Sequence, residues 1–114
     1  MTAKSPITTH ILDLGSGKPA TGVTVVLYRV TEAREQLVAT GRTNNDGRIT
    51  DWFASDLEAG QYRLRFQTGE WYQAQGLDTF FPEVNLDFQV SDTGAHYHVP
   101  LLLNQWGYST YRGS

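Results

Sequence analysis

Apolar residues along this chain recur with period two or in short blocks, and clusters of Gly, Pro, Asn and Asp interrupt them roughly every eight to twelve residues. Because successive side chains of a strand point to opposite faces, this pattern is typical of a β-sandwich. Eight strands, enough for two four-stranded sheets, are predicted. They cover residues 7–14, 23–30, 36–42, 48–52, 61–67, 85–90, 96–103 and 108–112.

The segments between the predicted strands carry residues typical of turns. Gly, Ser and Pro in residues 15–19 end the first strand, and the Asn-Asn-Asp-Gly sequence of residues 44–47 tolerates positive φ angles. Only residues 68–77 resemble a helix, with Thr68 as its N-cap and Glu70 in its first turn. The prediction is therefore an all-β sandwich of eight strands with one short helix.

Length and composition indicate one folded domain. The chain has 114 residues, of which 39% are hydrophobic and 18% charged, far from the composition of disordered chains. It contains no internal repeat, low-complexity segment or linker. We expect a single domain over residues 1–114.

Charge and cysteine content exclude several classes of function. A net charge of −3 without a run of Lys or Arg argues against a nucleic-acid or anionic-membrane partner. The absence of cysteine excludes disulfides, thiolate nucleophiles and Cys-ligated zinc. No apolar signal-like segment begins the chain, and no stretch is apolar enough to span a bilayer. We expect a cytoplasmic protein, and a periplasmic one if a leader peptide was removed.

The first histidine lies on a largely apolar strand face. Alternation places Thr8, His10, Leu12 and Leu14 on one side of the predicted strand 7–14. A single histidine among leucines is more often a hydrogen-bonded structural residue than a catalyst. This segment alone therefore favours a structural role for His10.

The other two histidines share one face of the predicted strand 96–103. Proline lacks the N–H of a sheet ladder, so Pro100 predicts an edge strand or a bulge, with His98 facing away from the core. Two histidines at i and i+2 can bind a metal, but a catalytic zinc needs a third protein ligand. His10 is the only other histidine, so no metal is expected. The opposite face is the better core face and carries Tyr97, Val99, Leu101 and Leu103.

An arginine and the C-terminus carry further candidate chemistry. Arg48 follows a turn, where an arginine is usually solvated or forms a surface ion pair worth under about 1 kcal/mol. The chain ends with Tyr111, Arg112, Gly113 and Ser114 in a strand-like run, whereas termini are usually frayed. If this run is ordered, Ser114 brings a hydroxyl and an α-carboxylate to a fixed position.

The order of six segments is more specific than any one of them, and among the six the closing tetrapeptide is the most specific. The segments are residues 9–13 (THILD), 17–20 (GKPA), 43–48 (TNNDGR), 80–83 (FFPE) and 96–103 (HYHVPLLL), followed by residues 111–114 (YRGS). Together they resemble the 5-hydroxyisourate hydrolases, a family related to transthyretin. The resemblance covers nearly the whole chain.

This resemblance implies a transthyretin-like eight-stranded β-sandwich that assembles as a homotetramer, a dimer of dimers with a central ligand channel. It implies hydrolytic ring opening of 5-hydroxyisourate to 2-oxo-4-hydroxy-4-carboxy-5-ureidoimidazoline, on the route from urate to allantoin, without cofactor or metal. It also implies catalytic roles for His10, Arg48 and His98. The substrate-binding residues it implies are Leu12, Pro100, Tyr111, Arg112, Gly113 and Ser114.

The roles within this scheme follow from the side chains. Histidine titrates near neutral pH and can take a proton from water, so His98 is the favoured base. His10 then positions the water or protonates the leaving nitrogen, and the two roles can be exchanged. Arg48 stays protonated and polarises a carbonyl. The alternatives are a non-catalytic transthyretin-like carrier of a small aromatic ligand and a β-sandwich adhesion module, which leaves the histidines unexplained.

Overall fold

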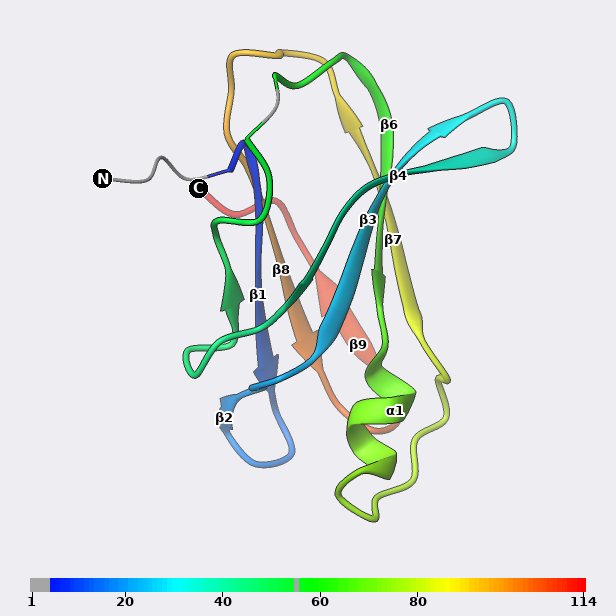
Figure 1. Ribbon diagram of the computed structural model, residues 1–114. Helices are drawn as coiled ribbons and strands as arrows, with labels where there is room; N and C mark the ends of the chain where they lie inside the picture. The colour runs from blue at the N-terminus through cyan, green and yellow to red at the C-terminus, as the bar shows by residue number, and fades with distance from the viewer. Residues whose placement is uncertain (1–4, 55) are drawn as a thin grey trace.

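The computed structural model describes residues 5–54 and 56–114. These residues form two sheets that face each other, with one short helix at one end of the sandwich (Figure 1). One sheet has the order β4-β3-β6-β7, and all its neighbouring strands are antiparallel. Its strands are β3 (Thr24–Thr31), β4 (Arg34–Arg42), β6 (Gly60–Phe66) and β7 (Val84–Val90).

The other sheet carries His10 and His98, and His96 directly precedes one of its strands. Its order is β2-β1-β8-β9, and β5 also pairs with β1. The two central strands, β1 and β8, run parallel, with Thr8 opposite His98 and His10 opposite Pro100. The strands are β1 (Ile7–Asp13), β2 (Lys18–Pro19), β5 (Arg48–Ile49), β8 (Tyr97–Leu103) and β9 (Tyr108–Thr110).

The core lies between the two sheets and follows the predicted alternation. In β8, Leu101 and Leu103 are buried, so the predicted core face of this strand is confirmed, and in β1 Ile7 and Ile11 are fully buried. Asp13 is a buried polar residue on this face, and its carboxylate accepts a 3.0 Å hydrogen bond from the hydroxyl of buried Tyr72. A buried carboxylate needs a hydrogen-bond donor. Here the donor is on the helix, so the bond links the helix to β1.

The helix is shorter than the sequence predicts. α1 covers Thr68–Gln73, and its N-cap is Gln67, not Thr68. Thr68 is the first helical residue, and its buried hydroxyl has no hydrogen-bond partner. Gly76 adopts a φ of 70°, and the Leu77 N–H bonds to the Tyr72 carbonyl. This left-handed residue turns the chain before the predicted end at residue 77.

The eight predicted strands are all present, but the structure adds the two-residue strand β2 and shortens the segment after Arg48. β5 ends at Ile49, and beyond it one backbone hydrogen bond, from the Ser5 N–H to the Thr50 carbonyl (2.9 Å), is followed by side-chain hydrogen bonds. The Ser5 hydroxyl accepts the N–H groups of Trp52 (2.9 Å) and Phe53 (3.1 Å). The Trp52 indole donates to the Ile7 carbonyl at 2.9 Å.

The prediction of an edge strand at Pro100 is wrong, because β8 lies between β1 and β9. The expected gap in the ladder is nevertheless present. β8 pairs with β9 from Leu103 to Leu101. The next described pairing toward the start of β8 is the isolated bridge between His98 and Gly113. Pro100 lies in this gap, where its missing N–H leaves no ladder bond unmade.

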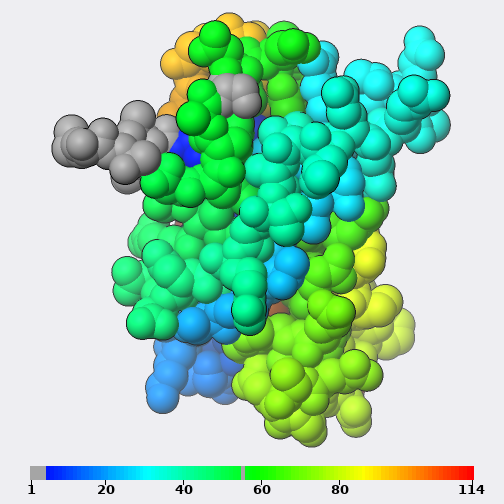
Figure 2. Space-filling model, in the orientation of Figure 1, coloured from blue at the N-terminus to red at the C-terminus, as the bar shows by residue number. Residues whose placement is uncertain are grey.

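An ion-pair network covers the outer face of the β4-β3-β6-β7 sheet. Arg63 bonds to Asp87 (2.6 Å) and to Glu35 (2.8 Å), and Arg65 bonds to Glu35 (2.6 Å). Glu35 thereby links β4 to β6 across the intervening β3. It lies near the β3–β4 hairpin, whose tip stands out from the body of the molecule (Figure 2).

No helix in the described part of the chain is long and apolar enough to cross a membrane.

Candidate functional site

The candidate site is a cavity of about 410 Å³ beside β1 and β8. Four parts of the chain meet there: β1, the segment around β5, the start of β8, and the last residues after β9. Figure 1 shows the C-terminus beside the start of β1. The cavity is lined by Thr8, Arg48, Thr50, His96, His98 and Ser114.

Arg48 is placed by the turn that precedes it. The side-chain oxygen of Asn44 accepts the N–H groups of Asp46 (2.9 Å) and Arg48 (3.0 Å) and closes the turn. Gly47 has a φ of 72°, and a Cβ there would lie 2.5 Å from the Ile11 carbonyl oxygen. Only glycine therefore lets the turn approach β1 so closely, and the resulting register sets Arg48 opposite His10.

His10 lies between two of the predicted site residues. It is opposite Arg48 on β5 and Pro100 on β8 and is partly buried. Burial and the positive charge of Arg48 lower the pKa of His10 below its ordinary 6.5, although a hydrogen bond to the Asp46 backbone and the Asp46 carboxylate oppose this. His10 is therefore a neutral imidazole at pH 7.

His98 and His96 share one hydroxyl. The Thr8 Oγ1 atom lies 2.8 Å from His98 Nδ1 and 3.2 Å from His96 Nε2, and Thr8 is only 1% exposed. The two imidazoles are nearly parallel, at 16°, with centroids 6.5 Å apart. Within residues 5–54 and 56–114, no three His, Asp or Glu side chains are grouped so that they would hold a metal ion.

The C-terminal segment lies directly against His98. The Gly113 N–H donates to the His98 carbonyl at 2.8 Å, and the two residues form an antiparallel bridge. A Cβ on Gly113 would lie 2.6 Å from His98 Cδ2, so a larger residue would displace the imidazole or the segment. This contact brings Ser114 and its hydroxyl to the cavity.

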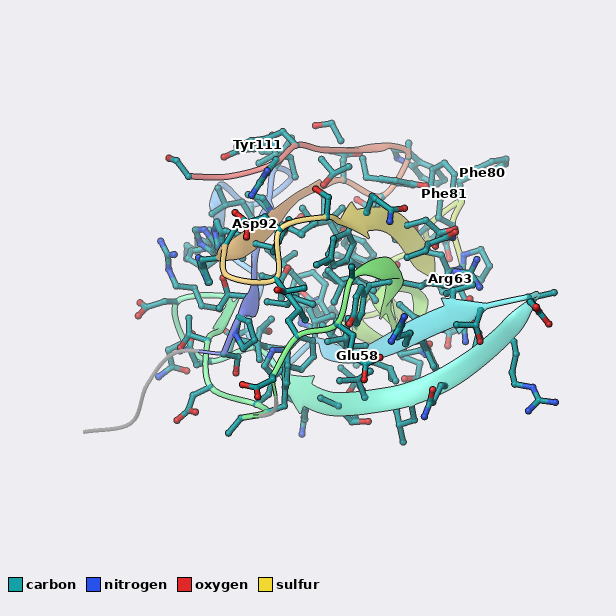
Figure 3. All side chains as sticks on the ribbon, turned by 90° about the horizontal axis from the view of Figure 1, so that it is seen from above. Glu58, Arg63, Phe80, Phe81, Asp92 and Tyr111 are labelled. Carbon is teal, nitrogen blue, oxygen red and sulfur yellow. The ribbon has the colours of Figure 1, made fainter. Side chains whose placement is uncertain are left out.

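Tyr111 and Arg112 point elsewhere. Both line a second cavity of about 350 Å³ beside β7, and the Arg112 guanidinium lies 4.5 Å from the centre of the Tyr97 ring. Figure 3 shows Tyr111 along the outer margin of the molecule, and its side chain is 57% exposed. Leu12 and Pro100 lie on the His10 face of the sheet, outside the lining of the site cavity.

The structure thus brings His98, Arg48 and Ser114 into one cavity and sets His10 beside Arg48. The catalytic roles of His10, Arg48 and His98 stay predictions. The same holds for the substrate-binding roles of Leu12, Pro100, Tyr111, Arg112, Gly113 and Ser114.

Comparison with known proteins identifies the family to which the chain belongs. The family model described as HIUase/Transthyretin matches residues 7–113. The chain belongs to this family. A Salmonella typhimurium relative named 5-hydroxyisourate hydrolase is 50% identical over 109 residues, which cover 95% of this chain and 80% of the relative.

Solved structures from both branches of the HIUase/Transthyretin family share the fold. A Klebsiella pneumoniae 5-hydroxyisourate hydrolase superimposes with a TM-score of 0.85 at 42% identity, covering 95% of this chain and 98% of the other. Sea bream transthyretin in complex with thyroxine superimposes with a TM-score of 0.89 at 29% identity, covering 96% and 95%. The transthyretin-like sandwich predicted from the sequence is confirmed, and the backbone fold alone does not separate the two branches.

The sequence analysis did not single out Thr8 and Thr50, which line the cavity, and it considered His96 only as a possible metal ligand. A signal for Thr8 was available, because alternation sets it on the same face as His10. Its pairing with the histidines was not readable, since that depends on the parallel register between strands 90 residues apart.

Proposed function

We propose that this member of the HIUase/Transthyretin family is a 5-hydroxyisourate hydrolase, which opens the six-membered ring of its substrate to give 2-oxo-4-hydroxy-4-carboxy-5-ureidoimidazoline. The observation that carries the proposal is the meeting of His98, Arg48 and Ser114 in one cavity. The names of the relatives support it, as does the higher identity to the Klebsiella hydrolase than to sea bream transthyretin, 42% against 29%.

Hydrolysis of a cyclic amide needs an activated water, a stabilised oxyanion and a proton for the leaving nitrogen. In our proposal His98 takes a proton from the attacking water and returns it to the nitrogen when the C–N bond breaks. The carboxyl product then ionises, so one proton is released per turnover. General-base catalysis of this kind contributes roughly 10²- to 10⁴-fold.

Arg48 acts on the attacked carbonyl, and His10 acts on the attacking water. The guanidinium of Arg48 has donors at the cavity wall and stabilises the oxyanion that forms on the attacked carbonyl. The pKa of His10 is lowered by burial and by Arg48, so at pH 7 His10 holds no extra proton to donate. This favours a role for His10 in positioning the water. Ser114 binds a polar edge of the substrate through its hydroxyl.

The same proposal includes a homotetramer. Leu14 is 56% exposed on the His10 face, next to the partly buried Leu12, and an apolar strip of this kind is usually covered in a soluble protein. The strands β7 and β9 each end a sheet, and an open sheet edge is a template for pairing with another copy. The two features support a dimer of dimers with two kinds of contact.

Turnover separates this function from the carrier function of the transthyretin branch. Freshly prepared 5-hydroxyisourate should lose its ultraviolet absorbance faster in the presence of the protein than in buffer, at a rate proportional to protein concentration and for many equivalents of substrate. A carrier would bind one equivalent or less per site and slow the spontaneous decay. Decay that stays at the buffer rate would rule out the hydrolase.

A further inference from the structure

Arg112 lies on the opposite side of β8 from the candidate site. Its guanidinium is 4.5 Å from the centre of the Tyr97 ring, in the cavity of about 350 Å³ beside β7. Tyr97 belongs to the core between the sheets, whereas the neighbouring His98 lines the site cavity, because successive side chains of a strand point to opposite faces. The C-terminal segment, residues 111–114, therefore passes from one face of β8 at Arg112 to the other at Ser114.

The described contacts that hold this segment on β8 are few. The ladder between β8 and β9 ends at Thr110, and the next bridge joins Gly113 to His98, with a hydrogen bond of 2.8 Å from the Gly113 N–H to the His98 carbonyl. Between these two pairings, the contact of Arg112 with Tyr97 attaches the segment to the other face of the strand. Loss of this contact would leave the Gly113 bridge to hold the segment.

Tyr97 is a fixed platform for Arg112. It is 4% exposed, and its hydroxyl accepts a hydrogen bond from the Asp92 N–H (3.1 Å) and donates one to the Asp92 carbonyl (3.0 Å). A guanidinium over the face of an aromatic ring is attracted by the quadrupole of the ring. Arg112 forms no ion pair with the residues that the structure describes, so no carboxylate among them competes with the ring for its charge.

We propose that Arg112 is a positioning residue, which packs on Tyr97 and thereby holds the C-terminal segment on β8 with Ser114 at the site cavity. In this role Arg112 does not touch the substrate, unlike in the substrate-binding role that the family resemblance implies. The proposal rests on the proposed function for its effect on turnover, but the anchoring itself is a property of the free protein.

Hydrogen exchange of the Gly113 amide tests the anchor without substrate. This amide is protected while its bond to the His98 carbonyl is closed. Arg112→Ala removes the guanidinium and should speed Gly113 exchange by roughly 3- to 30-fold, the factor in an equilibrium that one cation–π contact supplies. Arg112→Lys keeps a cation and should recover part of the protection. A Gly113 amide that exchanges at the wild-type rate in Arg112→Ala would overturn the proposal.

Arg34→Ala is the matched control for the loss of a positive charge. Arg34 is an exposed residue of β4 and forms no ion pair among the residues that the structure describes. The substitution should leave the exchange of Gly113 at the wild-type rate. Faster exchange of the same size in Arg34→Ala would mean that net charge, and not the contact with Tyr97, protects the amide.

Substitutions of Tyr97 test whether the ring is the partner. Tyr97→Phe keeps the ring, so Arg112→Ala should still speed the exchange of Gly113 in that background. Tyr97→Leu removes the ring, and Arg112→Ala should then have little further effect. An equal effect of Arg112→Ala with and without the ring would contradict the anchor. If Tyr97→Leu is unfolded, the comparison of Arg112→Ala with wild type and with Tyr97→Phe decides.

Kinetics separate a positioning role from contact with the substrate. Only protein whose C-terminal segment is docked is competent, so in a tetrameric Arg112→Ala protein kcat/KM should fall by roughly 2- to 10-fold. For the same reason it should fall by no more than the factor by which Gly113 exchange rises. An arginine that binds the substrate directly would lower kcat/KM beyond that factor. Such a larger fall, or an unchanged kcat/KM, would overturn the proposal.

A double-mutant cycle with Ser114 gives a second kinetic test. Ser114→Ala removes the hydroxyl that Arg112 is proposed to place, so Arg112→Ala should cost less in this background than in the wild type. A substrate contact of Arg112 that is independent of Ser114 would cost the same in both backgrounds, and that result would contradict a positioning role.

The two proposals fail in different ways. If the wild type does not accelerate the decay of 5-hydroxyisourate, the proposed function is wrong, and the anchor is then judged by Gly113 exchange alone. If the wild type is active and Gly113 exchanges equally fast in Arg112→Ala and in the wild type, the function stands and the role of Arg112 is wrong.

Discussion

Gly113 shows how one missing side chain positions the C-terminus. A Cβ on this residue would lie 2.6 Å from His98 Cδ2, closer than real contacts allow. We predict that Gly113→Ala lifts Ser114 away from the cavity and lowers kcat/KM by about 10²-fold, because misplacement of a site group by about 1 Å has effects of this size. The melting temperature should change little, since Gly113 lies outside the core cluster.

Gly107→Ala is the matched control for this prediction. A Cβ at Gly107 meets no atom within 4 Å, so the substitution should leave activity and stability unchanged. Full activity in a Gly113→Ala protein that is folded and tetrameric would show that the close approach to His98 has no role in the site.

The charge of Arg48 adds to burial in lowering the pKa of His10. Burial and the Arg48 charge lower the pKa of His10, so neutral His10 persists below pH 6.5. Arg48→Met removes the charge and should raise the pKa of His10, whereas Arg48→Lys keeps a charge and should raise it less. NMR titration of His10 measures both changes. A His10 pKa that is the same in Arg48→Met and wild type would leave burial as the sole cause.

Among the elements, local patterns were predictable and pairings between distant strands were not. Alternation correctly divided β1 into two faces and assigned the buried face of β8, because it depends only on neighbouring residues. The predicted helix was too long at its C-terminal end. There Gly76 turns the chain with a positive φ, which helical periodicity does not reveal. The shared hydroxyl of Thr8 depends on the parallel β1–β8 register, which is set by the whole sheet.

The site was predictable mainly through the family resemblance. Motif order pointed to His98, Arg48 and Ser114, which the fold does bring to one cavity. Residue chemistry alone favoured a structural role for His10 and a solvated position for Arg48. His10 and Arg48 are neighbours because the turn at Gly47 lies close to β1. This close approach is a feature of the fold that the sequence pattern does not contain.

Glu35 contributes stability that depends on pH. Hydrogen bonds from Arg63 and Arg65 lower the pKa of Glu35, and a hydrogen bond from Arg63 lowers the pKa of Asp87. A carboxyl with a lowered pKa in the folded state stabilises the fold above its ordinary pKa, and this contribution is lost as the pH falls through the folded value. We predict that Glu35→Gln lowers the free energy of unfolding at pH 7 and has little effect near pH 2.

Urea denaturation at the two pH values measures this difference. Glu32→Gln is the control, because Glu32 lies on the same hairpin and forms no ion pair among the residues that the structure describes. An equal effect of Glu35→Gln at both pH values would mean that the side chain acts through packing and not through its charge.

The whole molecule is expected to work as an assembly. The exposed Leu14 and the open edges of β7 and β9 predict a mass of about four times 12.8 kDa by light scattering at micromolar concentration. Leu14→Glu places a charge in the apolar strip and should weaken one of the two contacts, giving dimers. A wild-type monomer with full activity would contradict the tetramer.

The most direct test of the account compares the decay of 5-hydroxyisourate with wild-type protein and with His98→Asn. The wild type should accelerate the loss of absorbance in proportion to its concentration. His98→Asn keeps a polar side chain beside Thr8 but removes the base, so its rate should fall by roughly 10²- to 10⁴-fold, toward that of buffer. A wild type that leaves the spontaneous rate unchanged, or a folded His98→Asn protein as active as the wild type, would contradict a hydrolase whose base is His98.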